Sequence, residues 1–177
     1  VMIIGSGALG SSILRIVKLY NPKAIIVTDI DDAKLEEAKK NGATYTINSL
    51  KEDVPAKAHE LTEGYGPTVT IDAACVKGSL LTALQATGNA GRVITMGFSV
   101  APTEVNQFVI TSKELDVRGS RLQNRKFQDV IDLVNEGKVD LRGSISHTWN
   151  FEDAQAAFDF VDSRDPSYRK GVLTFKK

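Results

Sequence analysis

The sequence has little of what builds disulfides, metal sites or catalytic triads. Among its 177 residues there is one cysteine, Cys75, and there are two histidines, His59 and His147. A single cysteine excludes an intrachain disulfide and with it a disulfide-stabilised secreted fold. These residues are also too few to form a typical zinc site, because zinc is usually coordinated by about four ligands held close together. We therefore expect no metal in this chain, and Cys75, which follows an apolar segment, is interpreted as a small buried hydrophobe.

An excess of charge and a long hydrophobic run are also absent. The 22 basic and 22 acidic residues cancel, and no basic run offers the electrostatic footprint that nucleic acid requires. No apolar run approaches the roughly 20 residues that span a bilayer. The first residues resemble a strand rather than a signal segment. We expect a cytoplasmic protein without a nucleic-acid or membrane partner, and a piece of a longer protein, since Val1 already lies inside an expected strand.

Against this background, the most informative feature is a glycine-rich turn formed by residues 5–10. Gly5, Gly7 and Gly10 follow an apolar run directly and open an amphipathic stretch. In a dinucleotide-binding turn, the first glycine permits the tight turn, the second lets the backbone approach a pyrophosphate, and the third lets the helix pack close to the strand. The phosphates then lie at the N-terminus of the helix. A turn with only a structural role is the alternative.

An acidic residue follows at the distance that this motif predicts. The second apolar segment, residues 24–28, ends at Asp29, about twenty residues beyond the last glycine. A carboxylate there accepts hydrogen bonds from the adenosine ribose and repels a 2′-phosphate, so NAD is favoured over NADP. The alternative is that Asp29 only begins the N-cap of the next helix.

Strand-like and helix-like segments alternate along the chain, which predicts an α/β fold of the Rossmann type. This fold is a doubly wound parallel sheet of six strands, in the order 3-2-1-4-5-6, with helices on both faces. The expected strands cover residues 1–4, 24–28, 45–47, 68–73, 92–96 and 115–118. The length of the chain predicts a single hydrophobic core.

Beyond the sixth strand the pattern changes to two helical stripes and a final strand. The stripes are formed by Phe127, Val130, Ile131 and Val134, and by Ala154, Ala157, Phe158 and Val161. We expect both stripes to face a core. Asn150 is the expected N-cap of the second helix, and residues 171–175 form the expected strand. The predicted domains are a nucleotide-binding domain over residues 1–137 and a C-terminal segment over residues 138–177.

Taken together in their order, these segments resemble the nucleotide-binding and C-terminal part of the medium-chain dehydrogenase/reductase superfamily, of the zinc-type alcohol and sorbitol dehydrogenase kind. The resemblance covers nearly the whole chain. It is carried by residues 5–10, 27–31, 40–43, 90–93, 97, 118–121, 147–158 and 170–175.

The resemblance implies which residues contact which part of NAD. Those at the adenosine and pyrophosphate end are Gly5, Gly7, Ala8, Leu9, Gly10, Asp29, Ile30, Lys34, Ala73, Ala74 and Lys170. Those at the nicotinamide end are Met96, Gly97, Phe98, Ser120, Arg121 and Leu122. The amides of Ala8 and Leu9 would hold the pyrophosphate, and Asp29 with Lys34 would address the ribose.

For the complete protein, the resemblance implies zinc-dependent hydride transfer from a CH–OH group to NAD. The substrate would be a small polyol, sugar acid or alcohol, and the protein would be a homo-oligomer, a dimer or a tetramer. In this family the zinc ligands and the proton relay lie in an N-terminal domain, so no catalytic or metal-binding residue is assigned here. We expect this chain to bind NAD without turnover, and residues 138–177 to pack on that domain.

Two other functions are also compatible with the sequence. A zinc-independent quinone or enoyl reductase of the same superfamily usually prefers NADP, so Asp29 counts against it. A regulatory nucleotide-sensing domain also opens with a glycine-rich turn and an acid after its second strand, and the segment after the sixth strand argues against that reading.

Overall fold

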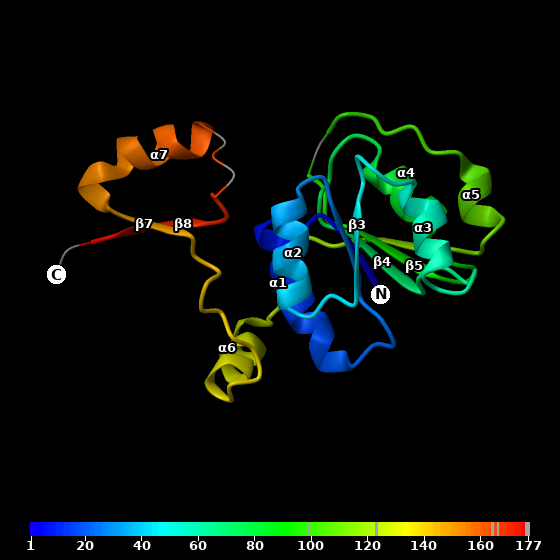
Figure 1. Ribbon diagram of the computed structural model, residues 1–177, viewed down its shortest axis with the longest axis horizontal. Helices are drawn as coiled ribbons and strands as arrows, with labels where there is room; N and C mark the ends of the chain where they lie inside the picture. Colours follow the sequence, from blue (N-terminus) through cyan, green and yellow to red (C-terminus); the bar gives the residue numbers. More distant parts are fainter. Residues whose placement is uncertain (99, 123, 164, 166, 176–177) are drawn as a thin grey trace. The chain divides into compact units, whose positions relative to one another are not determined.

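The computed structural model describes residues 1–98, 100–122, 124–163, 165 and 167–175. It divides the chain into two compact units, Val1–Asp132 and Leu133–Lys177 (Figure 1). The observed division falls inside a helix, whereas the sequence analysis placed the boundary after residue 137. The length had also suggested a single core, but each unit has its own packing.

The first unit is built on a six-stranded parallel sheet in the order β3-β2-β1-β4-β5-β6, which confirms the predicted Rossmann-type topology. The strands are β1 (Met2–Ile4), β2 (Ile26–Asp29), β3 (Tyr45–Asn48), β4 (Val69–Asp72), β5 (Arg92–Thr95) and β6 (Asp116–Gly119). Strand β1 pairs with β2 on one side and with β4 on the other. The strand order therefore reverses at β1, where open α/β sheets form their ligand crevice.

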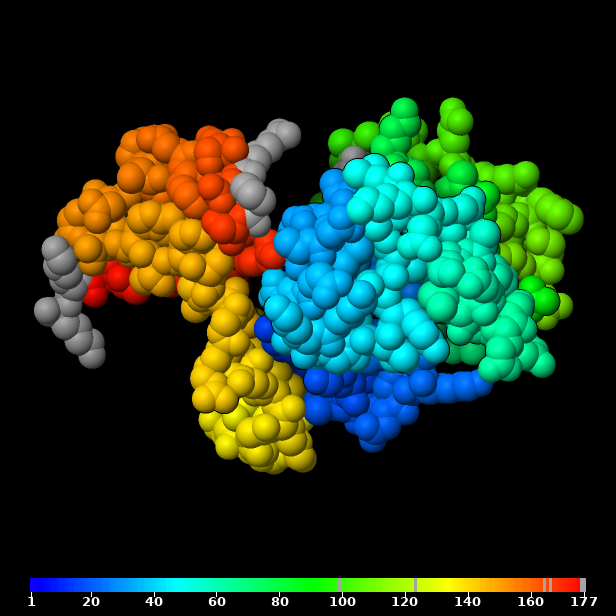
Figure 2. Space-filling view, in the orientation of Figure 1, coloured from blue at the N-terminus to red at the C-terminus, as the bar shows by residue number. Residues whose placement is uncertain are grey.

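Helices cover both faces of this sheet (Figure 1). They are α1 (Ala8–Val17), continued by the 3-10 turn η1 (Lys18–Tyr20), α2 (Asp32–Lys40), α3 (Val54–Glu60), α4 (Ser79–Ala86) and α5 (Gln107–Thr111). Helix α6 (Phe127–Asn135) follows β6, has no buried residue, and contains the boundary between the two units. In the space-filling view, α2 and the segment around β3 form one continuous surface (Figure 2). Among the described residues, no helix is both long enough and apolar enough to cross a membrane.

The period-two pattern of the central strands explains why both faces are covered. On β1, Ile3 belongs to a cluster with Leu14 of α1, whereas Met2 belongs to a cluster with Val54 and Leu84 of α3 and α4. Successive side chains of a strand point to opposite faces, so an all-apolar strand buries both faces of the sheet. The core of the first unit is therefore split into two layers by the sheet.

The glycine turn between β1 and α1 depends on two backbone features. Gly5 has φ +92°, a left-handed conformation that glycine adopts without steric cost. Gly10 lies so close to the preceding turn that a Cβ atom built on it would be 1.9 Å from the Gly5 carbonyl oxygen. Gly7 differs from both, because a Cβ atom there would meet nothing within 4 Å. The space beside Gly7 is open.

The second unit is a small β-α-β arrangement. Strand β7 (His147–Asn150) pairs in parallel with β8 (Gly171–Thr174), and the 3-10 turn η2 (Phe151–Asp153) and α7 (Ala154–Asp162) connect them. The rings of His147, Trp149 and Phe160 pack together, with centroids 4.6–5.7 Å apart. The sequence predicted α7 and β8 but not β7, because the segment His-Thr-Trp-Asn lacks a clear alternation of apolar residues. Asn150, the expected N-cap of α7, precedes η2 and makes no side-chain capping bond, and the N-cap residue of α7 is Asp153.

The expectation that both helical stripes face a core is wrong for α6 and holds only in part for α7. No residue of α6 is buried, and Phe127 is 70% exposed. In α7 only Ala157 is buried, and Phe158 is 62% exposed. Helical periodicity reports that a helix has an apolar face, but it does not identify what covers that face.

The contrast between Gly10 and Gly7 gives a stability prediction. Gly10→Ala forces a methyl group against backbone atoms and should cost about 3 kcal/mol, which lowers Tm by roughly 6–12 °C at this chain length. Gly7→Ala should cost less, about 0.5–1 kcal/mol, because its Cβ enters open space and the cost is only that of the poorer N-cap residue at the start of α1. Thermal unfolding followed by circular dichroism measures both. Equal Tm values for the two variants would contradict the close approach at Gly10.

A second prediction concerns pH. Asp116 accepts hydrogen bonds from Arg118 at 2.9 Å and from Arg92 at 2.8 Å, which lowers its pKa from 3.8 to about 2. The ionised carboxylate therefore stabilises the fold above pH 3.8, and this contribution is lost as the pH falls through about 2. Asp116→Asn should lower Tm at pH 6 and have little effect near pH 2. A Tm difference that stays constant between these pH values would refute this assignment.

Candidate functional site

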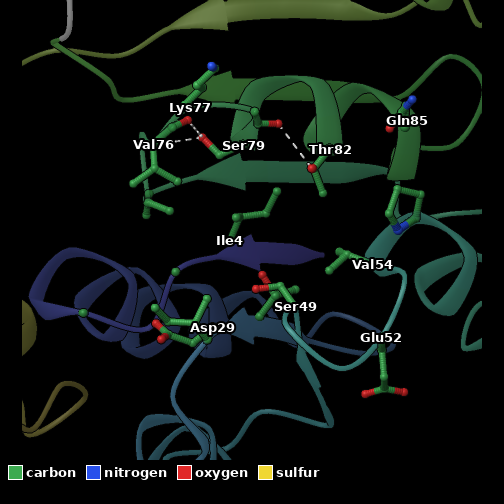
Figure 3. A pocket seen from close by; sticks show the side chains of 18 of the residues that line it. Ile4, Asp29, Ser49, Glu52, Val54, Val76, Lys77, Ser79, Thr82 and Gln85 are labelled. Atoms are coloured by element: carbon green, nitrogen blue, oxygen red, sulfur yellow. Dashed lines mark hydrogen bonds between the residues drawn. The ribbon is translucent and has the colours of Figure 1, made fainter. Parts of the chain in front are cut away.

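A cleft of about 710 Å³ opens in the first unit where the strand order reverses. Figure 3 shows Asp29 and Ser49 on one side of it and Ser79 and Thr82 on the other, with Ile4 of β1 between them. The cleft is lined by Ile4, Gly5, Gly7, Thr28, Asp29, Ile30, Lys34, Ser49, Glu52, Asp53, Val54, Pro55, Ala73, Ala74, Val76, Lys77, Gly78, Ser79, Thr82 and Gln85. Most of these residues follow the carboxyl ends of β1 to β4, where ligands bind in open α/β sheets.

Asp29 connects β2 to the glycine turn. One carboxylate oxygen, Oδ2, accepts the Ser6 amide at 2.7 Å, and Oδ1 accepts the Asp31 amide at 3.1 Å. The cap of α2 is instead Asp31, whose side chain accepts the Ala33 amide at 2.8 Å. The helix-capping role considered for Asp29 is therefore performed by Asp31. Because each carboxylate oxygen has a second lone pair, Asp29 can also accept hydrogen bonds from ligand hydroxyls in the cleft.

The first turn of α1 offers donors beside the same cleft. The Ser11 amide donates to the Gly7 carbonyl at 2.9 Å, so the amides of residues 8–10 precede the first hydrogen-bonded turn of the helix. All residues in the first turn of α1 are described by the structure, and none of them is acidic. Free amides and the positive end of the helix dipole favour an anion, and the open space beside Gly7 permits one to approach.

The opposite wall is shaped by a buried carboxylate. Asp72, at the end of β4, is 1% exposed and accepts the Cys75 amide at 3.0 Å and the Ser79 hydroxyl at 2.7 Å. These bonds fix the loop that contains Ala73 and Ala74. Burial, together with the nearby Asp72 charge, raises the pKa of the Cys75 thiol. Cys75 is half-buried rather than buried as the sequence predicted, and a protonated thiol suits a structural role.

A second group of predicted residues lies at the ends of β5 and β6. Met96, Gly97 and Phe98 follow β5, and Ser120 and Arg121 follow β6. The Ser120 amide donates to the Thr95 carbonyl at 2.9 Å. The Arg121 guanidinium lies 4.9 Å from the centre of the Phe98 ring. The structure thus brings the two segments together, although none of these residues lines the cleft itself.

The cleft unites seven of the predicted residues: Gly5, Gly7, Asp29, Ile30, Lys34, Ala73 and Ala74. Ala8, Leu9 and Gly10 form the first turn of α1. Leu122 is an exposed residue beyond β6. Lys170 lies in the second unit directly before β8, and its carbonyl accepts the Ser146 amide at 2.9 Å. The ligand contacts assigned to all of these residues remain predictions.

The sequence patterns did not predict the lining residues that follow β3, those of the loop before α4, or those of α4 itself. These residues are Ser49, Glu52, Asp53, Val54, Pro55, Val76, Lys77, Gly78, Ser79, Thr82 and Gln85. A signal for them existed, because the expected third and fourth strands end immediately before them and carboxyl strand ends share one edge of a parallel sheet. Within the part of the chain that the structure describes, no group of three His, Cys, Asp or Glu side chains could hold a metal ion.

Comparison with known proteins gives a family match and several relatives. The family model for zinc-binding dehydrogenases matches residues 8–136. The starvation-sensing protein RspB of Escherichia coli K12 is 36% identical over all of this chain, which covers 52% of that protein. Sorbitol dehydrogenase of Gallus gallus is 26% identical over 90% of the chain and 45% of that protein. D-xylulose reductase A of Aspergillus niger is 30% identical over 91% of the chain and 46% of that protein.

Solved structures agree with these matches. A crystal structure from Escherichia coli CFT073, described as a short chain alcohol dehydrogenase (rspB) complexed with NADH, has a TM-score of 0.88 and 37% identity. The match covers 98% of this chain and 51% of that one. A 2R,3R-butanediol dehydrogenase from Bacillus subtilis, at 23% identity and a TM-score of 0.87, shares the fold. The chain thus spans about half the length of the relatives that it matches.

Proposed function

Because the chain belongs to the zinc-binding dehydrogenase family, we propose that it is the NAD-binding portion of a zinc-dependent oxidoreductase that acts on a CH–OH group. The observation that carries this proposal is the position of Asp29. Its carboxylate lines the cleft, is bonded to the Ser6 amide of the glycine turn, and keeps lone pairs for a ribose diol. The dehydrogenase relatives and the NADH-bound neighbour support it.

The residues of the cleft suit the parts of NAD. The pyrophosphate would bind the amides of Ala8 and Leu9 in the first turn of α1. Asp29 and Lys34 would hold the adenosine ribose, and Ile30, which is 61% exposed, would provide an apolar surface for the adenine. The residues after β5 and β6 would receive the nicotinamide end. When bound, NAD supplies the hydride acceptor, and this chain binds and orients it.

The substrate and the zinc would be bound outside this chain. The described residues offer no metal site, so we assign the zinc ligands, the proton relay and most of the substrate pocket to the part of the relatives that this chain does not cover. Residues 138–177 would pack on that part. The substrate would be a small polyol, sugar acid or alcohol, and the complete protein would be a cytoplasmic homo-oligomer. The chain alone should bind NAD without catalysing oxidation.

Parallel titrations with NADH and NADPH test the proposal directly. The purified chain is titrated with each cofactor, following cofactor fluorescence and confirming the affinities by calorimetry. We expect clear saturable binding of NADH and weaker binding of NADPH, because the Asp29 charge repels a 2′-phosphate. A folded chain that binds neither cofactor would contradict the proposal.

Asp29→Ser should weaken NADH binding about tenfold to a hundredfold and improve NADPH binding, because it removes ribose hydrogen bonds together with a repelling charge. Glu36→Ser is a control: it removes a carboxylate of α2 that does not line the cleft and that pairs with Lys39 at 3.0 Å, away from the residues assigned to the ribose. The control should change NADH affinity less than about threefold. An Asp29→Ser variant with the parent's cofactor preference would disprove the ribose assignment.

A further inference from the structure

A buried side-chain amide supports the loop that contains Asp29. Asn48, the last residue of β3, is 6% exposed and does not line the cleft. Its Nδ2 donates to the Ile30 carbonyl at 3.2 Å and to Asp32 Oδ1 at 2.6 Å, and its Oδ1 accepts the Leu50 amide at 3.0 Å. Both N–H groups and the carbonyl of this amide are therefore used. Asn48 joins the end of β3 to the loop between β2 and α2.

One peptide group transmits this support to Asp29. The carbonyl of Ile30 and the N–H of Asp31 belong to the same planar peptide, and in a trans peptide they point in opposite directions. Asn48 holds the carbonyl, and the N–H donates to Asp29 Oδ1 at 3.1 Å. Fixing the carbonyl therefore also fixes the donor that orients the Asp29 carboxylate.

An ion pair keeps Asn48 in place. Asp32 Oδ2 accepts Lys51 Nζ at 2.6 Å while its Oδ1 accepts Asn48. The hydrogen bonds from Lys51 and Asn48 lower the pKa of Asp32, so this residue remains an ionised acceptor. The side chain of Asp32 is 62% exposed, so the pair contributes mainly by setting the direction of the Asn48 amide.

From these contacts we propose that Asn48 is a positioning residue that increases the selectivity of the cleft for NADH over NADPH by orienting Asp29. This inference rests on the proposed function. Asp29 is oriented by two donors, the Ser6 amide at Oδ2 and the Asp31 amide at Oδ1. The two hydroxyls of a ribose diol can both donate to Asp29 only when its carboxylate is held in a fixed orientation. A ribose with a 2′-phosphate has lost one of these hydroxyls and cannot form the paired interaction. Loss of the Asn48 donor should therefore weaken NADH binding and leave NADPH binding nearly unchanged.

Asn48→Leu tests this without adding a charge and with a side chain of similar branched shape. The leucine side chain cannot donate to the Ile30 carbonyl or to Asp32, where the amide lay 3.2 Å and 2.6 Å from its acceptors. We expect the Kd for NADH to rise about five- to tenfold and the Kd for NADPH to change less than about twofold. A wild-type selectivity ratio in this variant would overturn the inference.

Asp32→Ala provides a milder variant that keeps the test valid if Asn48→Leu fails to fold. It removes one acceptor of Asn48 from an exposed position, and it should lower the selectivity ratio about threefold. Glu36→Ala is the matched control on the same helix, because it removes an exposed ion pair, with Lys39 at 3.0 Å, whose carboxylate is also 62% exposed. An Asp32→Ala ratio equal to that of Glu36→Ala would count against the inference.

A double-mutant cycle separates positioning from general destabilisation. If Asn48 acts through Asp29, adding Asn48→Leu to Asp29→Ser should change the NADH affinity by less than about twofold. An undiminished effect of Asn48→Leu in that background would show that Asn48 does not act through Asp29. The two proposals fail differently: a wild-type chain without NADH preference refutes the proposed function, whereas an NADH-selective chain whose selectivity ignores Asn48 refutes only the positioning role.

Discussion

The hydrogen bond between the Ser6 amide and the Asp29 carboxylate is the interaction on which the rest of the site depends. It is 2.7 Å long and joins residues 23 positions apart in the sequence. This bond holds the turn after β1 against the end of β2. It therefore brings the open side of Gly7, the first amides of α1 and the Asp29 carboxylate to the same region of the cleft.

The cleft is formed by loops, and polar side chains at strand ends give these loops a defined shape. Asp29 at the end of β2, Asn48 at the end of β3 and Asp72 at the end of β4 each accept or donate hydrogen bonds to a neighbouring loop. Asn48 and Asp72 are buried, and buried polar groups are costly unless they are satisfied, so these two side chains fix the backbone that satisfies them. The half-buried Asp29 is held by two backbone amides. The same residues that end the strands therefore determine the walls of the site.

Sequence patterns predicted the elements of the first unit well and the surroundings of the later helices poorly. Strands with long apolar runs, such as β1 and β2, were located to within two residues. The apolar faces of α6 and α7 were read as core faces, yet Phe127 and Phe158 are exposed. Strand β7 was missed, because pairing with β8 and ring packing between His147 and Trp149, rather than alternation, define it.

The sequence by itself determined the fold class and the residues of the glycine turn with Asp29, because these depend on local periodicity and on the spacing of a few residue types. The strand order followed from the Rossmann-type topology that this motif indicates, rather than from any local pattern. Tertiary structure alone decided which Asp caps α2, which residues beyond β3 and on α4 line the cleft, and how Asn48 reaches the peptide beside Asp29. These features depend on contacts between strand ends far apart in the chain. Such contacts leave no local pattern, because they exist only once parallel pairing has brought the carboxyl ends of the strands to one edge of the sheet.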